Sequence, residues 1–255
     1  MSMLTYQTNV WEGDYRVILN GSYLEKIISR CDSDFVSKEI IVNNVDNREE
    51  VENLLKKKIV SRTIDRYYFV EDYIKIVLDH FKLTKEDFKG AYYVSSSELV
   101  GIYLCKSEYL LYFKGDSHLY KGSSGWIHQG LKLLSTNREF LVANPTWNNR
   151  KKEAQQEADA EIDNFYISYG FSDQCFLTKV KDLQRPIYNT IHPDAERYPW
   201  GNSFEAMLYS HMKYNGLRRL THKYDNYRHK NFRAANWVQN NLMSRGLYSY
   251  YRLNF

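Results

Sequence analysis

An aspartate and a histidine separated by one residue follow the most apolar segment of the sequence. Asp116 and His118 come soon after the run YLLYF at 109–113. A carboxylate and an imidazole on one extended turn can bind the same divalent cation, and this pair suits Mn²⁺ or a similar metal that bridges phosphate groups. A D-x-H triplet alone is equally typical of a turn with a capping aspartate and a solvated histidine. Its place after an apolar strand favours the metal site.

The elements that must position this pair alternate between strand and helix. We expect strands at 15–20, 39–42, 67–70 and 109–113, and helices at 24–28, 48–58 and 73–81. This order predicts an α/β fold with a mainly parallel central sheet and helices on both faces. Ligands of such sheets bind beyond the carboxyl ends of the strands. The polar residues at these ends are Asn20, Asn43, Asn44, Asp46, Glu71 and Asp72, all of which also suit ordinary turns and caps.

The second half of the sequence is less regular. We expect a helix at 126–134, a strand at 140–143 ended by Asn144-Pro145, a charged exposed helix at 150–163, a strand at 176–177, a mobile loop at 192–200, and a helix at 203–215 with Ser203 as its N-cap. In the tail, Phe232, Ala235, Val238 and Leu242 recur at near-helical spacing. We therefore expect one domain over 1–230 and a helical tail over 231–255 that packs on the domain or on a partner subunit.

Composition limits the class of protein. The 255 residues are 43% hydrophobic and 26% charged, which is ordinary for a globular domain. The sequence has no apolar run long enough to span a membrane, and its three cysteines lie far apart. Because residues 1–7 lack the basic and apolar pattern of a secretory leader, we expect none, and we expect a cytoplasmic protein. A net charge of +4 is too small to indicate a nucleic-acid partner. The 23 tyrosines would suit a cleft that stacks sugars or bases, although codon bias gives the same excess.

The stretch at 95–118, SSSELVGIYLCKSEYLLYFKGDSH, resembles the sugar-nucleotide glycosyltransferases of the GT-A (Rossmann-like) fold. In that family a helix, a short turn and an apolar strand lead into an acidic metal motif, usually D-x-D. The form D-S-H is similar to that of the polypeptide N-acetylgalactosaminyltransferases. The resemblance implies a hexosyltransferase-like enzyme in which Asp116 and His118 hold Mn²⁺ or Mg²⁺ on the diphosphate of a nucleotide sugar, such as a UDP-sugar.

Two later stretches are similar to other parts of the same family. The segment YPWGNSFE at 198–205 resembles the acceptor side, where a glycine-containing turn opens a helix that carries an acidic residue. The resemblance puts Trp200 and Gly201 on the acceptor side and Glu205 near the reaction centre, although Glu205 also suits a first-turn residue that complements the helix dipole. Asp173, within the segment FSDQ at 171–174, resembles a further acceptor-side motif.

The resemblance also implies a third metal ligand and a donor site. The late segment at 220–229 supplies the third ligand, for which His229 is favoured over His222. Gly115 stands where the family commonly has an aspartate. The nucleotide-sugar site would comprise Asn20, Asn43, Asn44, Asp46, Asp72, Ser97 and Gly115.

Other functions explain less of the sequence. A nucleotidyltransferase shares the sheet type, but Asn20-Gly21-Ser22 is poor in glycine for its phosphate loop. A carbohydrate- or nucleotide-binding module without catalysis leaves the placement of Asp116 and His118 unexplained. We therefore expect a metal-dependent glycosyltransferase with a glycan or other hydroxyl acceptor. Glu205 favours inversion because the helix dipole would keep it ionised as a base, whereas the D-S-H resemblance is to a retaining family.

Overall fold

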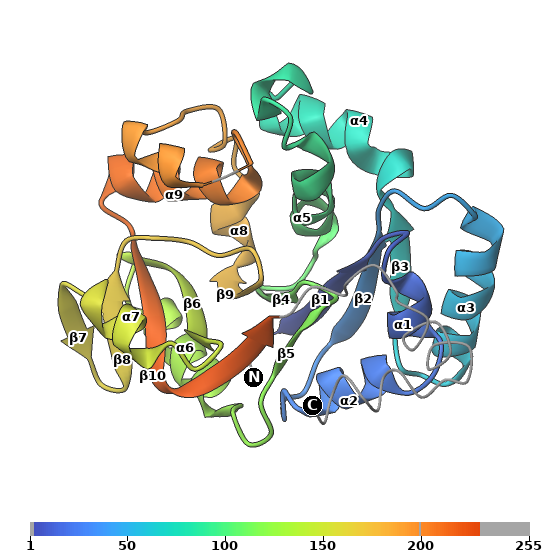
Figure 1. Ribbon diagram of the computed structural model, residues 1–255, viewed down its shortest axis with the longest axis horizontal. Helices are drawn as coiled ribbons and strands as arrows, with labels where there is room; N and C mark the ends of the chain where they lie inside the picture. Colours follow the sequence, from blue (N-terminus) through green and yellow to red (C-terminus); the bar gives the residue numbers. More distant parts are fainter. Residues whose placement is uncertain (1–2, 199, 230–255) are drawn as a thin grey trace.

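The computed structural model describes residues 3–198 and 200–229. They form a ten-stranded mixed sheet in the order β3-β2-β1-β4-β9-β6-β10-β8-β7, with β5 paired to β10 (Figure 1). Helices cover both faces of the sheet, as predicted. The predicted C-terminal helix lies outside the described residues. No helix in the described ranges is long and apolar enough to cross a membrane.

The first half is the parallel part of the sheet. Strands β2, β1 and β4 pair in parallel, and β3 continues the same direction beside β2. The predicted strands at 39–42, 67–70 and 109–113 and the three predicted helices are confirmed. The elements are β1 (Leu4–Val10), α1 (Tyr15–Leu19), α2 (Tyr23–Ser29), β2 (Ser37–Val42), α3 (Arg48–Val60), β3 (Arg66–Phe69), α4 (Val70–Phe81), a 3-10 turn (Glu86–Phe88), α5 (Tyr92–Leu104) and β4 (Tyr109–Phe113).

The first strand lies earlier than predicted. The prediction of a strand at 15–20 is wrong, because this segment contains helix α1. The first strand is β1. Every residue of β1 is buried, but several of its side chains are polar, so the sequence pattern did not indicate a buried strand. Gln7, for example, donates hydrogen bonds to Glu39 Oε2 and to the carbonyl of Gly101, both at 2.9 Å. Asn20 consequently caps the end of α1 on the exposed surface and does not stand at a strand end.

The second half mixes parallel and antiparallel strands. Strand β9 runs antiparallel to both β4 and β6, and β10 runs parallel to β6 and antiparallel to β8 and β5. The predicted helices at 126–134 and 203–215 and the strand at 176–177 are confirmed. The elements are β5 (Ser117–Leu119), α6 (Gly125–Thr136), β6 (Phe140–Trp147), α7 (Lys151–Gln156), β7 (Ala160–Ile162), β8 (Phe165–Ser168), β9 (Cys175–Lys179), α8 (Val180–Leu183), a 3-10 turn (Pro193–Arg197), α9 (Phe204–Asn215) and β10 (Arg218–His229).

Three predictions for this half are corrected. Strand β6 continues through Pro145 to Trp147, because β9 pairs with β6 only as far as Ala143 and the proline therefore lies where one side of the strand has no partner. The predicted helix at 150–163 ends at Gln156, and the chain then forms β7. The predicted loop at 192–200 contains a 3-10 turn.

Strand β4 lies in the middle of the sheet and is buried on both faces. Leu110 and Tyr112 pack into the core formed with α4, α5 and α9, which lie above the sheet in Figure 1. Leu111 and Phe113 pack into the opposite core with α6. The residues that follow β4 therefore emerge between the parallel half of the sheet and the mixed half.

Gly115 lies where the chain after β4 passes the carboxyl end of β1. Its backbone N–H donates to Asn9 Oδ1 at 3.1 Å. A Cβ atom at this position would overlap the carbonyl oxygen of Asn9 and the Cδ1 atom of Ile18. The close approach of two backbones therefore explains the glycine, without any contact to a nucleotide.

We expect Gly115→Ala to lower the free energy of unfolding by about 1–3 kcal/mol, the usual cost of overpacking a closely packed site. Urea denaturation measures this cost. Gly125→Ala is the matched control, because its Cβ would lie 3.4 Å from the nearest atom, Asp225 Oδ2, and its stability should stay within about 0.5 kcal/mol of the parent. Equal stabilities of the two variants would contradict the close approach.

Candidate functional site

The loop after β4 and the end of β10 bring two of the predicted metal ligands together. Strand β5 pairs with the end of β10, so that Ser117 lies opposite His229. Asp116 Oδ2 lies 3.3 Å from His229 Nε2. The backbone N–H of His229 donates to Asn148 Oδ1 at 2.9 Å and fixes the end of the strand. His229, the histidine favoured by the sequence, is thus the neighbour of Asp116.

The other two candidate metal-ligating histidines, His222 and His118, have different surroundings. His222 is buried in the middle of β10, where its Nδ1 accepts a hydrogen bond from the backbone N–H of Asp225, and burial lowers the pKa of its imidazole. His118 lies with Nδ1 3.4 Å from the hydroxyl of Tyr23 on α2. Within 3–198 and 200–229, no three His, Cys, Asp or Glu side chains converge as a metal site. The roles of Asp116 and His118 as the metal pair, and of His229 as the third ligand, stay predictions.

Three hydrogen bonds connect the metal motif with the start of α9. The hydroxyl of Ser117 donates to Gln174 Oε1 at 3.2 Å, and Gln174 Nε2 donates to Asp173 Oδ1 at 2.9 Å. The backbone N–H of Asp173 then donates to Glu205 Oε1 at 2.9 Å. Asp173 and Glu205, both predicted on the acceptor side, are therefore direct neighbours.

A buried ion-pair network lies beneath this chain of hydrogen bonds. Lys114 Nζ lies 2.6 Å from Glu98 Oε1 and 2.9 Å from Asp173 Oδ2. Glu98 is fully buried and also accepts hydrogen bonds from Tyr112 and Ser97. Ser97, predicted to bind the nucleotide sugar, is itself buried and accepts a hydrogen bond from the Asn9 side chain. Through these two hydrogen bonds, Ser97 supports the loop that carries the metal motif.

The surroundings of Glu205 oppose its ionisation. Ser203 caps α9 as predicted, by accepting a hydrogen bond from the backbone N–H of Ala206. The prediction that the start of the helix favours the ionised form of Glu205 does not agree with the direction of its pKa shift. Burial, reinforced by the neighbouring charge of Asp173, raises the pKa of Glu205 well above its usual range, and Lys114 only partly opposes this. The sequence did not indicate the raised pKa, because Asp173 is 32 residues away from Glu205 in the chain.

We expect Glu205→Gln to stabilise the fold, and to do so more at pH 8 than at pH 5. A raised pKa means that the folded chain holds this proton more tightly than the unfolded chain does. The loss of folding stability caused by ionising Glu205 is therefore absent below the unfolded pKa of about 4.3 and grows as pH rises toward the pKa of the folded state. Each tenfold difference in proton affinity between the two states corresponds to about 1.4 kcal/mol of unfolding free energy. Urea denaturation at both pH values measures it.

The charged and titratable groups that act on Glu205 are Asp173 and Lys114, and Tyr198 and Tyr227 are its phenolic neighbours. None of these is altered in the variant. Glu49→Gln is the matched control, because Glu49 occupies the first turn of α3 but is exposed. A stability difference for Glu205→Gln that does not change with pH would contradict the raised pKa.

An open cleft of about 380 Å³ connects Glu205 with His229. It is bounded by the ends of β6 and β10, the loop before β9, the 3-10 turn and the start of α9. Its lining comprises Trp147, Asn148, Glu157, Phe171, Ser172, Gln174, Arg197, Tyr198, Glu205, Arg219, Tyr227 and His229. The arginines and Glu157 were not predicted, because β10 and the 3-10 turn bring them together only in the folded chain.

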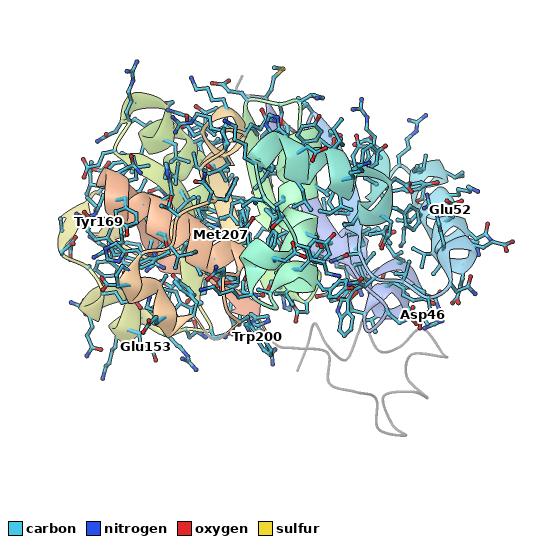
Figure 2. The ribbon with its side chains drawn as sticks, turned by 90° about the horizontal axis from the view of Figure 1, so that it is seen from above. Asp46, Glu52, Glu153, Tyr169, Trp200 and Met207 are labelled. Carbon is cyan, nitrogen blue, oxygen red and sulfur yellow. The ribbon has the colours of Figure 1, made fainter. Side chains whose placement is uncertain are left out.

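The three predicted acceptor-side residues, Trp200, Gly201 and Asp173, are not among those that line this cleft, although Asp173 contacts Glu205, which does line it. Trp200 is 67% exposed and lies with Asp46 along one edge of the molecule in Figure 2. Gly201 has a φ of +67°, and a Cβ there would lie 2.6 Å from the carbonyl oxygen of Lys89. The glycine therefore lets this loop pass close to the 3-10 turn at 86–88.

The predicted donor residues lie at different distances from the strand ends. Asn43 and Asn44 directly follow β2, and the Asn43 side chain donates to the carbonyl of Tyr93 at 2.7 Å. Asp46 lies two residues further along and is exposed. Asp72 forms a bidentate ion pair with Arg48 of α3, and these hydrogen bonds lower the pKa of its carboxyl.

Two residues at the end of β1 were missed in the sequence. Asn9 connects Gly115 with Ser97, and Trp11 is 52% exposed directly after the strand. The strand itself was not predicted, so the polar turn at 11–14 was not recognised as a strand end. The available signal was the strand-forming residues at alternate positions, Leu4, Tyr6, Thr8 and Val10.

Comparison with known proteins identifies the fold. No protein-family profile matches the sequence, and no curated protein matches it either. Among solved structures, the chain is similar to glucosyl-3-phosphoglycerate synthase from Mycobacterium tuberculosis in complex with Mn²⁺, UDP and glucosyl-3-phosphoglycerate, with a TM-score of 0.50 and 10% identity over 96% of this chain and 77% of that one. It is also similar to GalNAc-T7 with UDP, GalNAc and Mn²⁺, with a TM-score of 0.56 and 10% identity over 90% of this chain and 44% of that one.

Both of these proteins are glycosyltransferases of the GT-A fold. The predicted fold, a GT-A sheet with helices on both faces, is therefore confirmed. An identity of 10% establishes the fold alone, and the function has to be argued from the residues of this chain.

Proposed function

We propose that this protein is a metal-dependent glycosyltransferase that moves a sugar from a nucleoside-diphosphate sugar, such as a UDP-sugar, to an acceptor hydroxyl. The observation that carries the proposal is the pair of Asp116 and His229, 3.3 Å apart beyond the carboxyl end of β4 in a GT-A fold. Further support comes from the two similar structures, whose complexes contain UDP and Mn²⁺.

The donor set fits a divalent metal. A carboxylate oxygen and an imidazole nitrogen are ligands that suit Mn²⁺, and Mg²⁺ would depend more on the carboxylate and on water. Asp116 and His229 would hold the ion, with His118 as a further ligand. When bound, the metal would neutralise negative charge on the leaving diphosphate.

The remaining residues divide between a donor side and an acceptor side. Asn43 and Asn44 follow β2 and Trp11 follows β1. The exposed side chains of Asn44 and Trp11 are available to a nucleotide at these strand ends, whereas the Asn43 side chain is buried against Tyr93. Glu205 lines the cleft that also contains His229, which supports an acceptor position next to the metal pair.

Glu205 is the proposed base for inversion of the anomeric carbon. Its carboxyl is held by the backbone N–H of Asp173, which fixes its orientation at the cleft. The raised pKa of Glu205 makes its ionised carboxylate a stronger base than an ordinary carboxylate. Glu205 would accept the proton of the acceptor hydroxyl as that oxygen attacks.

We expect Asp116→Ala to abolish the metal dependence of nucleotide binding, because it removes the carboxylate of the proposed pair. Calorimetric titration of UDP with and without Mn²⁺ measures this effect, and the parent should bind UDP more tightly with the metal. Asp34→Asn, which removes an exposed carboxylate ahead of β2, is the control and should behave as the parent. Unchanged metal dependence in Asp116→Ala would place the metal elsewhere.

We expect Glu205→Gln to lower kcat by about 10²–10⁴-fold with UDP affinity nearly unchanged, the usual loss when a general base is removed. NMR of the glycosidic product should show the anomeric configuration opposite to that of the donor. Normal turnover of the variant, or retention of configuration, would refute the role of base. A module that only binds nucleotide would show UDP binding with no turnover in the parent.

A further inference from the structure

Two arginines that line the cleft both approach Gly170. A Cβ atom at Gly170 would lie 3.1 Å from Nη2 of Arg197 and 3.2 Å from Nη1 of Arg219, and both side chains line the cleft beside Glu205. Two guanidinium groups so close together repel one another, because each is always charged. An anion between them would turn this repulsion into attraction.

Arg219 is buried without full use of its donors. It lies in β10 and is only 4% exposed, with Nη2 at 2.6 Å from Glu157 Oε2 and 3.1 Å from the hydroxyl of Ser168. Its Nε is buried and has no hydrogen-bond partner among the described residues. A buried donor left unsatisfied costs about 1–3 kcal/mol, so this atom calls for an explanation beyond folding.

Arg197 is held by aromatic rings and not by a carboxylate. Its guanidinium lies 5.2 Å from the ring centre of Tyr198 and 4.5 Å from that of Tyr209, and Nη2 donates to the Tyr198 hydroxyl at 3.3 Å. In the described part of the chain, no carboxylate lies within ion-pair distance of it. Stacking occupies the faces of a guanidinium and leaves donors along its edge.

The acidic groups of the cleft do not cancel this charge. Glu157 is already paired with Arg219. Burial and the neighbouring charge of Asp173 raise the pKa of Glu205, which favours its neutral form. The unbalanced charge of the cleft is that of Arg197.

We propose that Arg197 and Arg219 bind an anionic group of the acceptor, either a phosphate or a carboxylate. Both groups present oxygen pairs that a planar guanidinium binds with two parallel hydrogen bonds. This inference deepens the proposed function, on which it rests, because it assigns a chemical class to the acceptor: a hydroxyl compound that also carries a negative charge.

The test uses inorganic phosphate and acetate as probes, each titrated calorimetrically into the full chain without metal or nucleotide. We expect phosphate or acetate affinity to fall by about tenfold to a hundredfold in Arg197→Gln, the range for a lost hydrogen bond to a charged group. Arg138→Gln removes an exposed arginine beyond the amino end of β6 and should leave the affinity unchanged. Glu157→Gln should increase it, because Arg219 is released from its ion pair.

The outcomes separate the two proposals. A response to phosphate alone identifies a phosphorylated acceptor, and a response to acetate alone identifies a carboxylate. Equal affinities in the parent and in Arg197→Gln, or binding of neither ion, would overturn the inference. UDP with Mn²⁺ is titrated separately into the parent protein. If UDP does not bind, the proposed donor site is refuted, whether or not Arg197→Gln weakens anion binding. If UDP binds but Arg197→Gln does not weaken anion binding, only the inference about the arginines is refuted.

Discussion

The ammonium group of Lys114 holds together the segments on which the candidate site depends. It follows β4 and pairs with Glu98 of α5 at 2.6 Å and with Asp173, ahead of β9, at 2.9 Å. Removing one partner of a buried pair leaves an uncompensated charge and typically costs about 3–5 kcal/mol. The segments therefore have little freedom to move apart, and the parallel and mixed halves of the sheet are fixed relative to each other where the site lies.

The positions of the metal motif and of Glu205 follow from that constraint. The backbone N–H of Asp173 donates a hydrogen bond to Glu205, and one carboxylate oxygen of Asp173 accepts a hydrogen bond from the side chain of Gln174. Gln174 in turn accepts a hydrogen bond from Ser117 of the D-S-H motif. A displacement of α9 would therefore be transmitted to the loop that carries Asp116. Such a framework suits a site whose two substrates must be held in register, since an error of about 1 Å in placement can cost a hundredfold in rate.

The sequence predicted those parts of the molecule that depend on local pattern. Strand β4 is five consecutive buried residues, and Asp116 was found from its place after that strand. Strand β1 was missed because Gln7 and Asn9 are polar, and the partners that make their burial favourable, Glu39 and Ser97, are distant in sequence. The protonation of Glu205 and the meeting of Arg197 with Arg219 depend in the same way on contacts formed only by folding.

The proposed metal side and the proposed acceptor side of the site contain different charged groups. Asp116 supplies a carboxylate on the proposed metal side, beside the carboxyl of Asp14, whose pKa burial raises well above its usual range. The proposed acceptor side contains Arg197 and Arg219, which would attract an anion. A donor diphosphate and an anionic acceptor would repel each other in water. Separate binding groups, a metal ion for one and guanidinium groups for the other, allow both to occupy neighbouring positions without competing for the same positive charge.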